Sequence, residues 1–372
     1  MHSHSHHRDS PAPERVSNLE LFFDLVFVFT ITQVATVVEQ SPNAGGLVRA
    51  AFELWIIAWM YGGYAWLTNS AGPDTWQRRL LLLVGMAGFF VCALAVPHAF
   101  DENAVVFGAG YLLVVLVHLT GFLLRPGRTP IRAILRLAPW NLISASLVLA
   151  AGFTGGSMRL ILWGAAISVQ LATPLLSRTN EGFMLNAEHF AERHGLMILI
   201  VLGESLVSVG LSVQHHERVD SSLLFGAMAG LALAAAMWWS YFVGEDERAA
   251  HAFGAASPRQ RADQALLGYG LAHAAMLYGV VALAAGTKLS VEDLAAPTTV
   301  FSAWLMAAGA AVFLAGTAAF RVALRFASPL SRILGAIVCL AAALVGPRSS
   351  AAAELALLAV IVAGMLVVER RS

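Results

Sequence analysis

Long apolar runs alternate with short polar breaks along most of the chain. Each run approaches the roughly 20 residues that an α-helix needs to cross the hydrocarbon core of a bilayer. The breaks contain Gly, Pro, Asn and Asp, which are typical of turns between helices. The pattern predicts an all-α, polytopic membrane protein with about twelve transmembrane helices. The predicted spans are residues 19–38, 47–67, 79–96, 104–124, 137–152, 158–176, 192–211, 221–243, 262–286, 298–320, 330–345 and 351–368.

The composition agrees with this class of protein. Hydrophobic residues make up 58% of the chain and charged residues only 12%, whereas a soluble domain carries roughly 25% charged residues. The 23 basic and 23 acidic residues cancel, so no basic surface is expected to bind nucleic acid. Cys92 and Cys339 both lie inside apolar runs and do not indicate a disulfide.

The domain organisation predicted from the sequence is simple. Residues 1–17 are expected to be a flexible His-rich tail, because they lack the apolar region of a secretory signal. Residues 18–372 form one polytopic domain, and short loops leave no room for an extramembrane domain. Arginines, including Arg321 and Arg332, concentrate at the helix ends on the side of the membrane where the N-terminus is predicted to lie. The positive-inside rule therefore predicts that both termini are cytoplasmic.

The chain also shows signs of an internal duplication, with halves at residues 18–180 and 185–372. A Glu-Arg pair precedes an acidic residue in each half, as Glu14-Arg15 precedes Asp24 and Glu192-Arg193 precedes Glu204. An aromatic-rich span follows each of them. Two six-helix units would be parallel repeats, and a central site would then lie between the first and seventh spans.

The first span contains two acidic residues. A charge near the centre of a transmembrane helix costs roughly 2.5 to 3.5 kcal/mol on insertion scales, so it needs a partner, a cavity or a function. Glu20 and Asp24 lie four residues apart and therefore share a helix face. Because like charges on adjacent turns repel, we expect one of them to be protonated or paired with a cation.

The seventh span holds a second polar set. Arg193 and Glu204 lie eleven residues apart, which returns them to nearly the same face about 16 Å apart. With His189 and Ser208 they form one polar stripe. This stripe and the acidic residues of the first span either line a pathway for a proton, ion or small polar solute, or form structural ion pairs between helices. We favour a site, because apolar packing would join helices without the cost of burying charge.

Three weaker features complete the pattern. Trp55 and Trp59 lie deeper in the second span, and their i, i+4 spacing is compatible with the wall of a pocket without requiring one, whereas the other aromatic residues near span ends, including Trp66, are typical of an interfacial belt. Glu53 and Glu354 lie near span ends and are expected at the interface. The last three spans contain almost no internal polarity, which predicts a scaffold.

Two motifs together resemble the bacterial low temperature requirement protein A (LtrA) family. They are ELFFDLVFV at residues 20–28 with ITQ at 31–33, and HFAERHGL at residues 189–196 with LGES at 202–205. The resemblance implies a multi-pass protein of the cytoplasmic membrane, named for a requirement in growth at low temperature, without a settled biochemical activity. The family's motif residues correspond to Glu20, Asp24, Gln33, Glu192, Arg193, Gly203 and Glu204.

The leading hypothesis from the sequence is a transporter or channel-like protein. In this hypothesis Asp24 and Glu204 bind a proton or cation, and Arg193 pairs with one of them or with an anionic group of a substrate. The candidate intramembrane polar site comprises Glu20, Asp24, Gln33, His189, Glu192, Arg193 and Glu204. The expected partners are the lipid bilayer and a small ion or solute.

Two other classes of function stay open. An intramembrane enzyme acting on lipid would use His189, Glu192 and His194, but the chain lacks an HExxH pattern, a P-loop, a serine nucleophile motif and a cysteine cluster. We therefore predict no catalytic residue, metal or cofactor. A sensor of the membrane state would fit the family phenotype, although no signalling domain is appended. The substrate and the oligomeric state are not identified by the sequence.

Overall fold

A computed structural model of the chain describes residues 16–70, 75–124, 128–177, 185–214, 220–290 and 294–371, and all regular elements in these ranges are helical. The α-helices are α1 (Asn18–Gln40), α2 (Ala44–Ser70), α3 (Trp76–Ala95), α4 (Ala104–Leu123), α5 (Arg128–Gly152), α6 (Gly156–Ser177), α7 (Ala187–Gln214), α8 (Ser221–Phe242), α9 (Glu245–Ala255), α10 (Pro258–Gln264), α11 (His273–Lys288), α12 (Val300–Leu324), α13 (Leu330–Ala341) and α14 (Ala351–Arg371). Short 3₁₀ or π segments are η1 (Val96–His98), η2 (Ala265–Ala272), η3 (Ala342–Leu344) and η4 (Gly346–Arg348).

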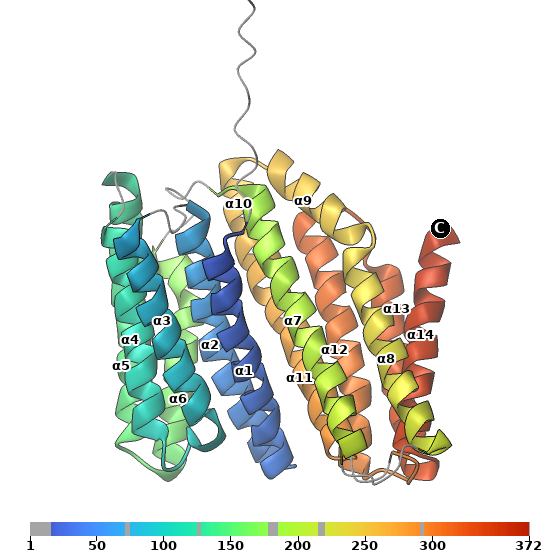
Figure 1. The fold of residues 1–372 in the computed structure, drawn as a ribbon. Helices are drawn as coiled ribbons and strands as arrows, with labels where there is room; N and C mark the ends of the chain where they lie inside the picture. Colours follow the sequence, from blue (N-terminus) through green and yellow to red (C-terminus); the bar gives the residue numbers. More distant parts are fainter. Residues whose placement is uncertain are drawn as a thin grey trace, which may run out of the picture.

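The helices stand side by side as a membrane bundle (Figure 1). Ten segments of the described chain are long and apolar enough to cross a membrane. Two further long helices, α2 and α7, of 27 and 28 residues, run alongside them. The predicted all-α fold of about twelve spans is thereby confirmed. Large apolar side chains such as Phe22, Leu175 and Val360 are exposed on the outside, as lipid contact requires.

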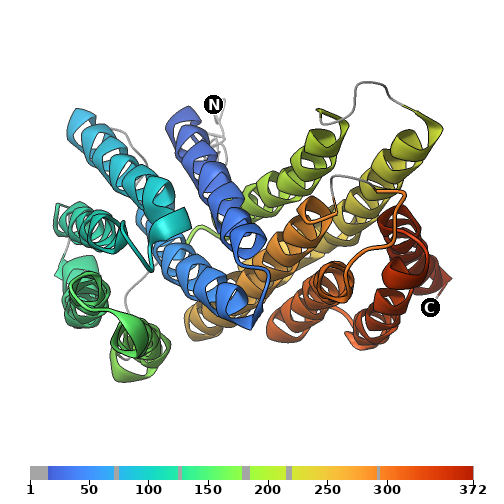
Figure 2. The same ribbon diagram turned by 90° about the horizontal axis from the view of Figure 1, so that it is seen from below.

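The helices form two groups in the view along the bundle, with α1 to α6 on one side and α7 to α14 on the other (Figure 2). Helix α1 packs against α7 and α11, and α2 packs against α7, along the seam between the groups. The first residues of α1 and the last of α14 lie at the same end of the bundle (Figure 1). That this end is cytoplasmic, and that the groups are repeats, both stay predictions.

Glycines permit the closest approach inside the second group. A Cβ atom added to Gly279 of α11 would lie 2.6 Å from the carbonyl oxygen of Gly309 in α12. Small residues at such crossings let two backbones touch and pack without voids in a membrane. Helix α11 of this closely packed pair also packs against α7, on the same side of the seam.

Helix α9 was not predicted. It follows α8 and lies across the end of the bundle (Figure 1). Gly244, in the left-handed conformation with φ of 78°, turns the chain, and Glu245, Asp246 and Glu247 form the first turn. Acidic side chains at a helix N-terminus interact favourably with the helix dipole and stabilise the helix. This sequence signal would have revealed α9.

Candidate functional site

Helices α1 and α7 meet at the seam through three buried charged residues. Arg193 of α7 contacts Asp24 of α1, with Nη2 2.8 Å from Oδ1. Its Nη1 lies 3.3 Å from Oε1 of Glu20, one turn earlier on α1. Each of the three residues is only 1% exposed. Together with His189 they are called here the N-terminal ion cluster.

Local structure positions the two carboxylates. Ser17 caps α1: its hydroxyl accepts a hydrogen bond from the Glu20 backbone N–H, and the Glu20 carboxylate accepts one from the Ser17 backbone N–H. This capping box fixes Glu20 at the first turn of the helix. Asp24 accepts a hydrogen bond from the hydroxyl of Tyr61 in α2, with an O–O distance of 3.0 Å. The Arg193 guanidinium also lies 5.6 Å from the centre of the Tyr61 ring.

The orientation of His189 follows from its neighbour Asn69. The Asn69 side chain donates to the carbonyl oxygen of Asn186 and accepts from the backbone N–H of Asn186, at 2.8 and 2.9 Å, which fixes the orientation of its amide. Its NH₂ group therefore donates to Nδ1 of His189, 3.4 Å away. The proton of a neutral His189 then resides on Nε2, which lies 3.3 Å from Oε1 of Glu20.

The charges of the N-terminal ion cluster do not balance. Two carboxylates share one guanidinium, so the cluster carries one negative charge in excess when His189 is neutral. Among the described residues, Oδ2 of Asp24 and Nε of Arg193 have no hydrogen-bond partner. An uncompensated buried charge is costly, and it is neutralised by a proton or by a cation.

The structure does not gather all residues predicted for the site. Glu192 is exposed, and its Oε2 accepts a hydrogen bond from the backbone N–H of Val16 at 3.3 Å. Gln33 lies nine residues beyond Asp24 on α1, on the opposite side of the helix and about 14 Å further along it. The side chains of Glu204 and Ser208 lie outside the described residues.

Some residues that hold the cluster in place were not predicted from the sequence. Tyr61 lies in an aromatic-rich span, where no pattern distinguishes it from its aromatic neighbours, and Asn69 lies in the last turn of α2. Ser17 carried a recognisable signal, because Ser followed three residues later by Glu is a capping box.

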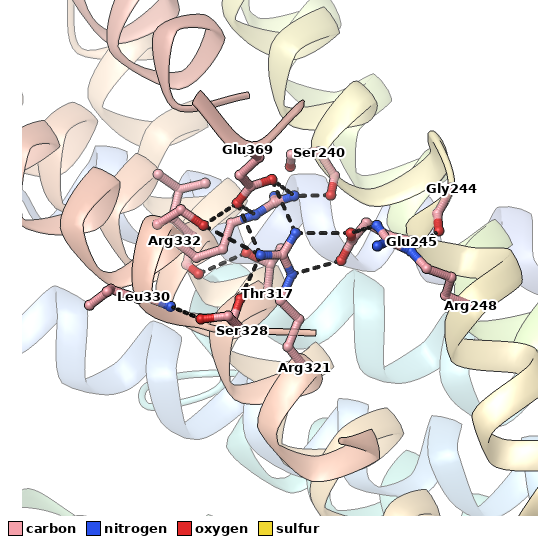
Figure 3. A network of polar contacts seen from close by, with 12 residues as sticks. Ser240, Gly244, Glu245, Arg248, Thr317, Arg321, Ser328, Leu330, Arg332 and Glu369 are labelled. Atoms are coloured by element: carbon pink, nitrogen blue, oxygen red, sulfur yellow. Dashed lines mark hydrogen bonds and ion pairs between the residues drawn. The ribbon is translucent and has the colours of Figure 1, made fainter. Parts of the chain in front are cut away.

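A second set of buried charges contradicts the prediction that the last three spans are a scaffold without polarity (Figure 3). Arg321 of α12 contacts both Glu245 of α9, at 2.9 Å, and Glu369 of α14, at 3.0 Å. Arg332 of α13 contacts Glu369 at 2.8 Å and donates to the carbonyl of Ser240 at 3.0 Å. These four charged residues are called here the C-terminal ion cluster. Arg321 and Arg332, which the sequence placed among the helix-end arginines, are 4% and 1% exposed.

Two other acidic residues also differ from expectation. Glu53 and Glu354 were predicted at the interface, but both are buried in the bundle. Neither oxygen of the Glu354 carboxyl has a hydrogen-bond partner among the described residues. Among all the residues that the structure describes, no group of three or more His, Cys, Asp or Glu side chains is arranged to hold a metal ion.

A cavity of about 170 Å³ lies beside the N-terminal ion cluster. Trp55 and Trp59 line it, an arrangement that their spacing allowed, and their rings stack 6.2 Å apart. Trp66, expected in an interfacial belt, lines it too. Tyr61 belongs both to the wall of the cavity and, through its hydroxyl, to the cluster. The two features are therefore adjacent.

The sequence of the chain was compared with known proteins and matches one family. A family model described as bacterial low temperature requirement A protein (LtrA) matches residues 15–368. An uncharacterized protein of Rhizobium meliloti (strain 1021), RA0937, is 26% identical over 349 residues, which cover 90% of this chain and 84% of that protein. No solved structure matches the chain.

Proposed function

The chain belongs to the bacterial low temperature requirement A (LtrA) family, and we propose that it is a transporter or channel-like protein for a proton or another small cation. The observation that carries the proposal is the excess negative charge of the N-terminal ion cluster, where Glu20 and Asp24 share the guanidinium of Arg193. One proton or cation neutralises this charge inside the membrane. The cluster is thus a binding place for one positive charge.

Binding for transport must be reversible, and the contacts of Arg193 allow an exchange of partners. Its guanidinium reaches Asp24 at 2.8 Å and Glu20 at a looser 3.3 Å. When one carboxylate is neutralised, the guanidinium pairs with the other and no net charge stays buried. Arg193 therefore acts as a movable counter-ion that releases the bound proton or cation.

The location of the cluster supports alternating access to it. Glu20 and Asp24 belong to one group of helices and Arg193 to the other (Figure 2). A rocking motion of the two groups would increase the distance between Arg193 of α7 and the carboxylates of α1. The carboxylates would then be exposed to one side of the membrane. Transporters built from two halves place their sites at such a seam.

The enzyme alternative gains no support from the contacts. His189 faces Glu20, whereas Glu192 is exposed and holds the chain before α1. His194 contacts neither of them in the described residues; its Nδ1 lies 2.8 Å from the carbonyl oxygen of Phe190. The three groups do not converge on one reacting centre, as acid–base catalysis requires.

Ion flux in proteoliposomes tests the proposal. Purified protein is reconstituted with a trapped pH dye, and a pH gradient or a K⁺ diffusion potential is imposed, with Na⁺ and K⁺ flux followed in parallel. Wild-type protein should move a proton or cation, and Asp24→Asn, which leaves Glu20 paired with Arg193, should reduce the rate at least about tenfold. Growth at low temperature of a deletion strain carrying each variant should follow the same order.

The matched control is Glu369→Gln in the C-terminal ion cluster. It also neutralises a buried, arginine-paired carboxylate, but flux per folded molecule should be unchanged. Equal flux in wild type and Asp24→Asn, or no flux of any tested ion in wild type, would overturn the proposal.

A further inference from the structure

The cavity beside the N-terminal ion cluster has the walls of a ligand site. Residues of α2, α4, α5, α6 and α7, together with η2 and α11, surround it, so it lies between the two groups of helices. Trp55 and Trp59 stack along one wall, and Tyr269 contributes from η2. The described residues that line it include no Asp, Glu, Lys or Arg. An aromatic, uncharged wall selects a flat, uncharged molecule.

Two buried polar groups of the wall lack partners. Nε1 of Trp55 has no hydrogen-bond partner among the described residues, and neither has the hydroxyl of Tyr269, a residue only 2% exposed. The indole N–H of Trp59, by contrast, donates to Oδ1 of Asn141 at 3.3 Å. Indole N–H groups only donate hydrogen bonds. A ligand that satisfies Trp55 must therefore carry an acceptor such as a carbonyl oxygen.

The backbone around the cavity is irregular in two helices. The segment η2, which contains Tyr269 and Gly270 of the wall, is a π-helix, and π segments occur frequently at functional sites. Pro174 lies inside α6 and also lines the cavity. A proline removes one helical hydrogen bond and bends a helix. These departures open space between helices that would otherwise pack tightly.

The size of the cavity limits the ligand. An apolar cavity of roughly 150 Å³ holds a benzene molecule, so about 170 Å³ accommodates one aromatic ring with a small substituent. We propose that this cavity binds a small, uncharged aromatic molecule that carries a hydrogen-bond acceptor. The proposal goes beyond cation transport, since binding requires no flux. Tyr61, in the wall, would pass an effect of the ligand to Asp24.

Three related probes test the chemistry by calorimetry on purified protein in nanodiscs, with empty nanodiscs subtracted. Acetophenone is uncharged and has an acceptor, ethylbenzene has the same carbon skeleton without one, and benzoate is charged. Wild-type protein should bind acetophenone at least about tenfold more tightly than ethylbenzene, as one hydrogen bond predicts, and benzoate should not bind measurably. Trp55→Phe keeps an aromatic ring at this position but removes the indole N–H. This variant should reduce the preference for acetophenone over ethylbenzene to about twofold or less.

A cavity-filling variant tests the place of binding. A Cβ atom added to Gly62, which lines the cavity, would meet nothing within 4 Å, so Gly62→Leu should fill the space and abolish acetophenone binding. Gly364→Leu is the matched control, because Gly364 is also open but lies exposed on α14. Binding that survives Gly62→Leu, or that does not exceed empty nanodiscs, would overturn the site. Equal affinity for ethylbenzene, or measurable binding of benzoate, would overturn the proposed ligand class.

Discussion

Two buried ion clusters lie at the same end of the bundle and differ in charge balance. The C-terminal ion cluster pairs Arg321 and Arg332 with two glutamates, Glu245 and Glu369. The N-terminal ion cluster provides two carboxylates with one arginine, Arg193. Burial does not distinguish them, since the central arginines are all less than 5% exposed.

The two clusters differ in whether all of their buried polar atoms have hydrogen-bond partners. Within the described residues, no buried side-chain oxygen or nitrogen of the C-terminal ion cluster lacks a hydrogen-bond partner, whereas Asp24 Oδ2 and Arg193 Nε do. A balanced, fully hydrogen-bonded network holds helices in register. An unbalanced network retains affinity for one more positive charge. Net charge and buried atoms without hydrogen-bond partners, rather than burial alone, therefore mark the candidate site.

Removing the single arginine of the unbalanced cluster should have the largest effect on stability. Arg193→Met leaves two buried carboxylates without a counter-ion, and we expect a loss of about 3 to 5 kcal/mol. Unfolding can be followed in detergent by the reaction of a thiol dye with Cys92 and Cys339, which are free and buried.

The control for this prediction is Arg321→Met. Glu369 keeps Arg332 and Glu245 keeps Arg248 in that variant, so the loss should be smaller, about 1 to 3 kcal/mol. A smaller loss for Arg193→Met than for Arg321→Met would contradict the difference in charge balance.

Neutralising one carboxylate in each cluster should affect stability to different extents. Glu369→Gln removes an acceptor of hydrogen bonds from Arg321 and Arg332 and should cost about 1.5 to 3 kcal/mol. Asp24→Asn removes the excess charge while its side-chain carbonyl still accepts from Tyr61, so stability should change by less than about 1 kcal/mol. The same dye assay measures both. Equal destabilisation by the two variants would show that the clusters are alike.

The smallest effect is expected at Glu192, a motif residue that the structure places outside the cluster. Its carboxylate is exposed and accepts a hydrogen bond from the Val16 backbone N–H. Glu192→Gln should therefore change stability by less than about 0.5 kcal/mol and leave flux in proteoliposomes unchanged. A large loss of flux in this variant would extend the site to the exposed face of α7.

Hydropathy predicted the fold well because membrane insertion depends on local composition. The predicted span 262–286 falls within the continuous helical segment Pro258–Lys288, and the span 330–345 within Leu330–Arg348. Helix α9 was missed because its polar residues resemble a loop to a hydropathy argument. The π segment η2 has no composition signal, since its residues are as apolar as those of a regular helix.

The candidate site was predicted only in part. The spacing of Trp55 and Trp59 allowed the wall of a pocket, and the cost of burying charge identified Glu20, Asp24 and Arg193 as residues that need partners. It did not identify Tyr61 or Asn69, because aromatic and amide groups near span ends are common in membrane helices. It also misplaced Arg321 and Arg332, because an arginine at a span end looks the same whether it faces water or an acidic neighbour.

The sequence by itself determined that this chain is a helical membrane protein of the LtrA family and which of its residues are costly to bury. Only the tertiary structure decided which costly residues meet. Asp24 and Arg193 are 169 positions apart in the chain, and their contact depends on how α1 packs against α7. Membrane spans can be predicted from local hydrophobicity. Charge balance and cavities depend on residues that are distant in the sequence and meet only when the helices pack.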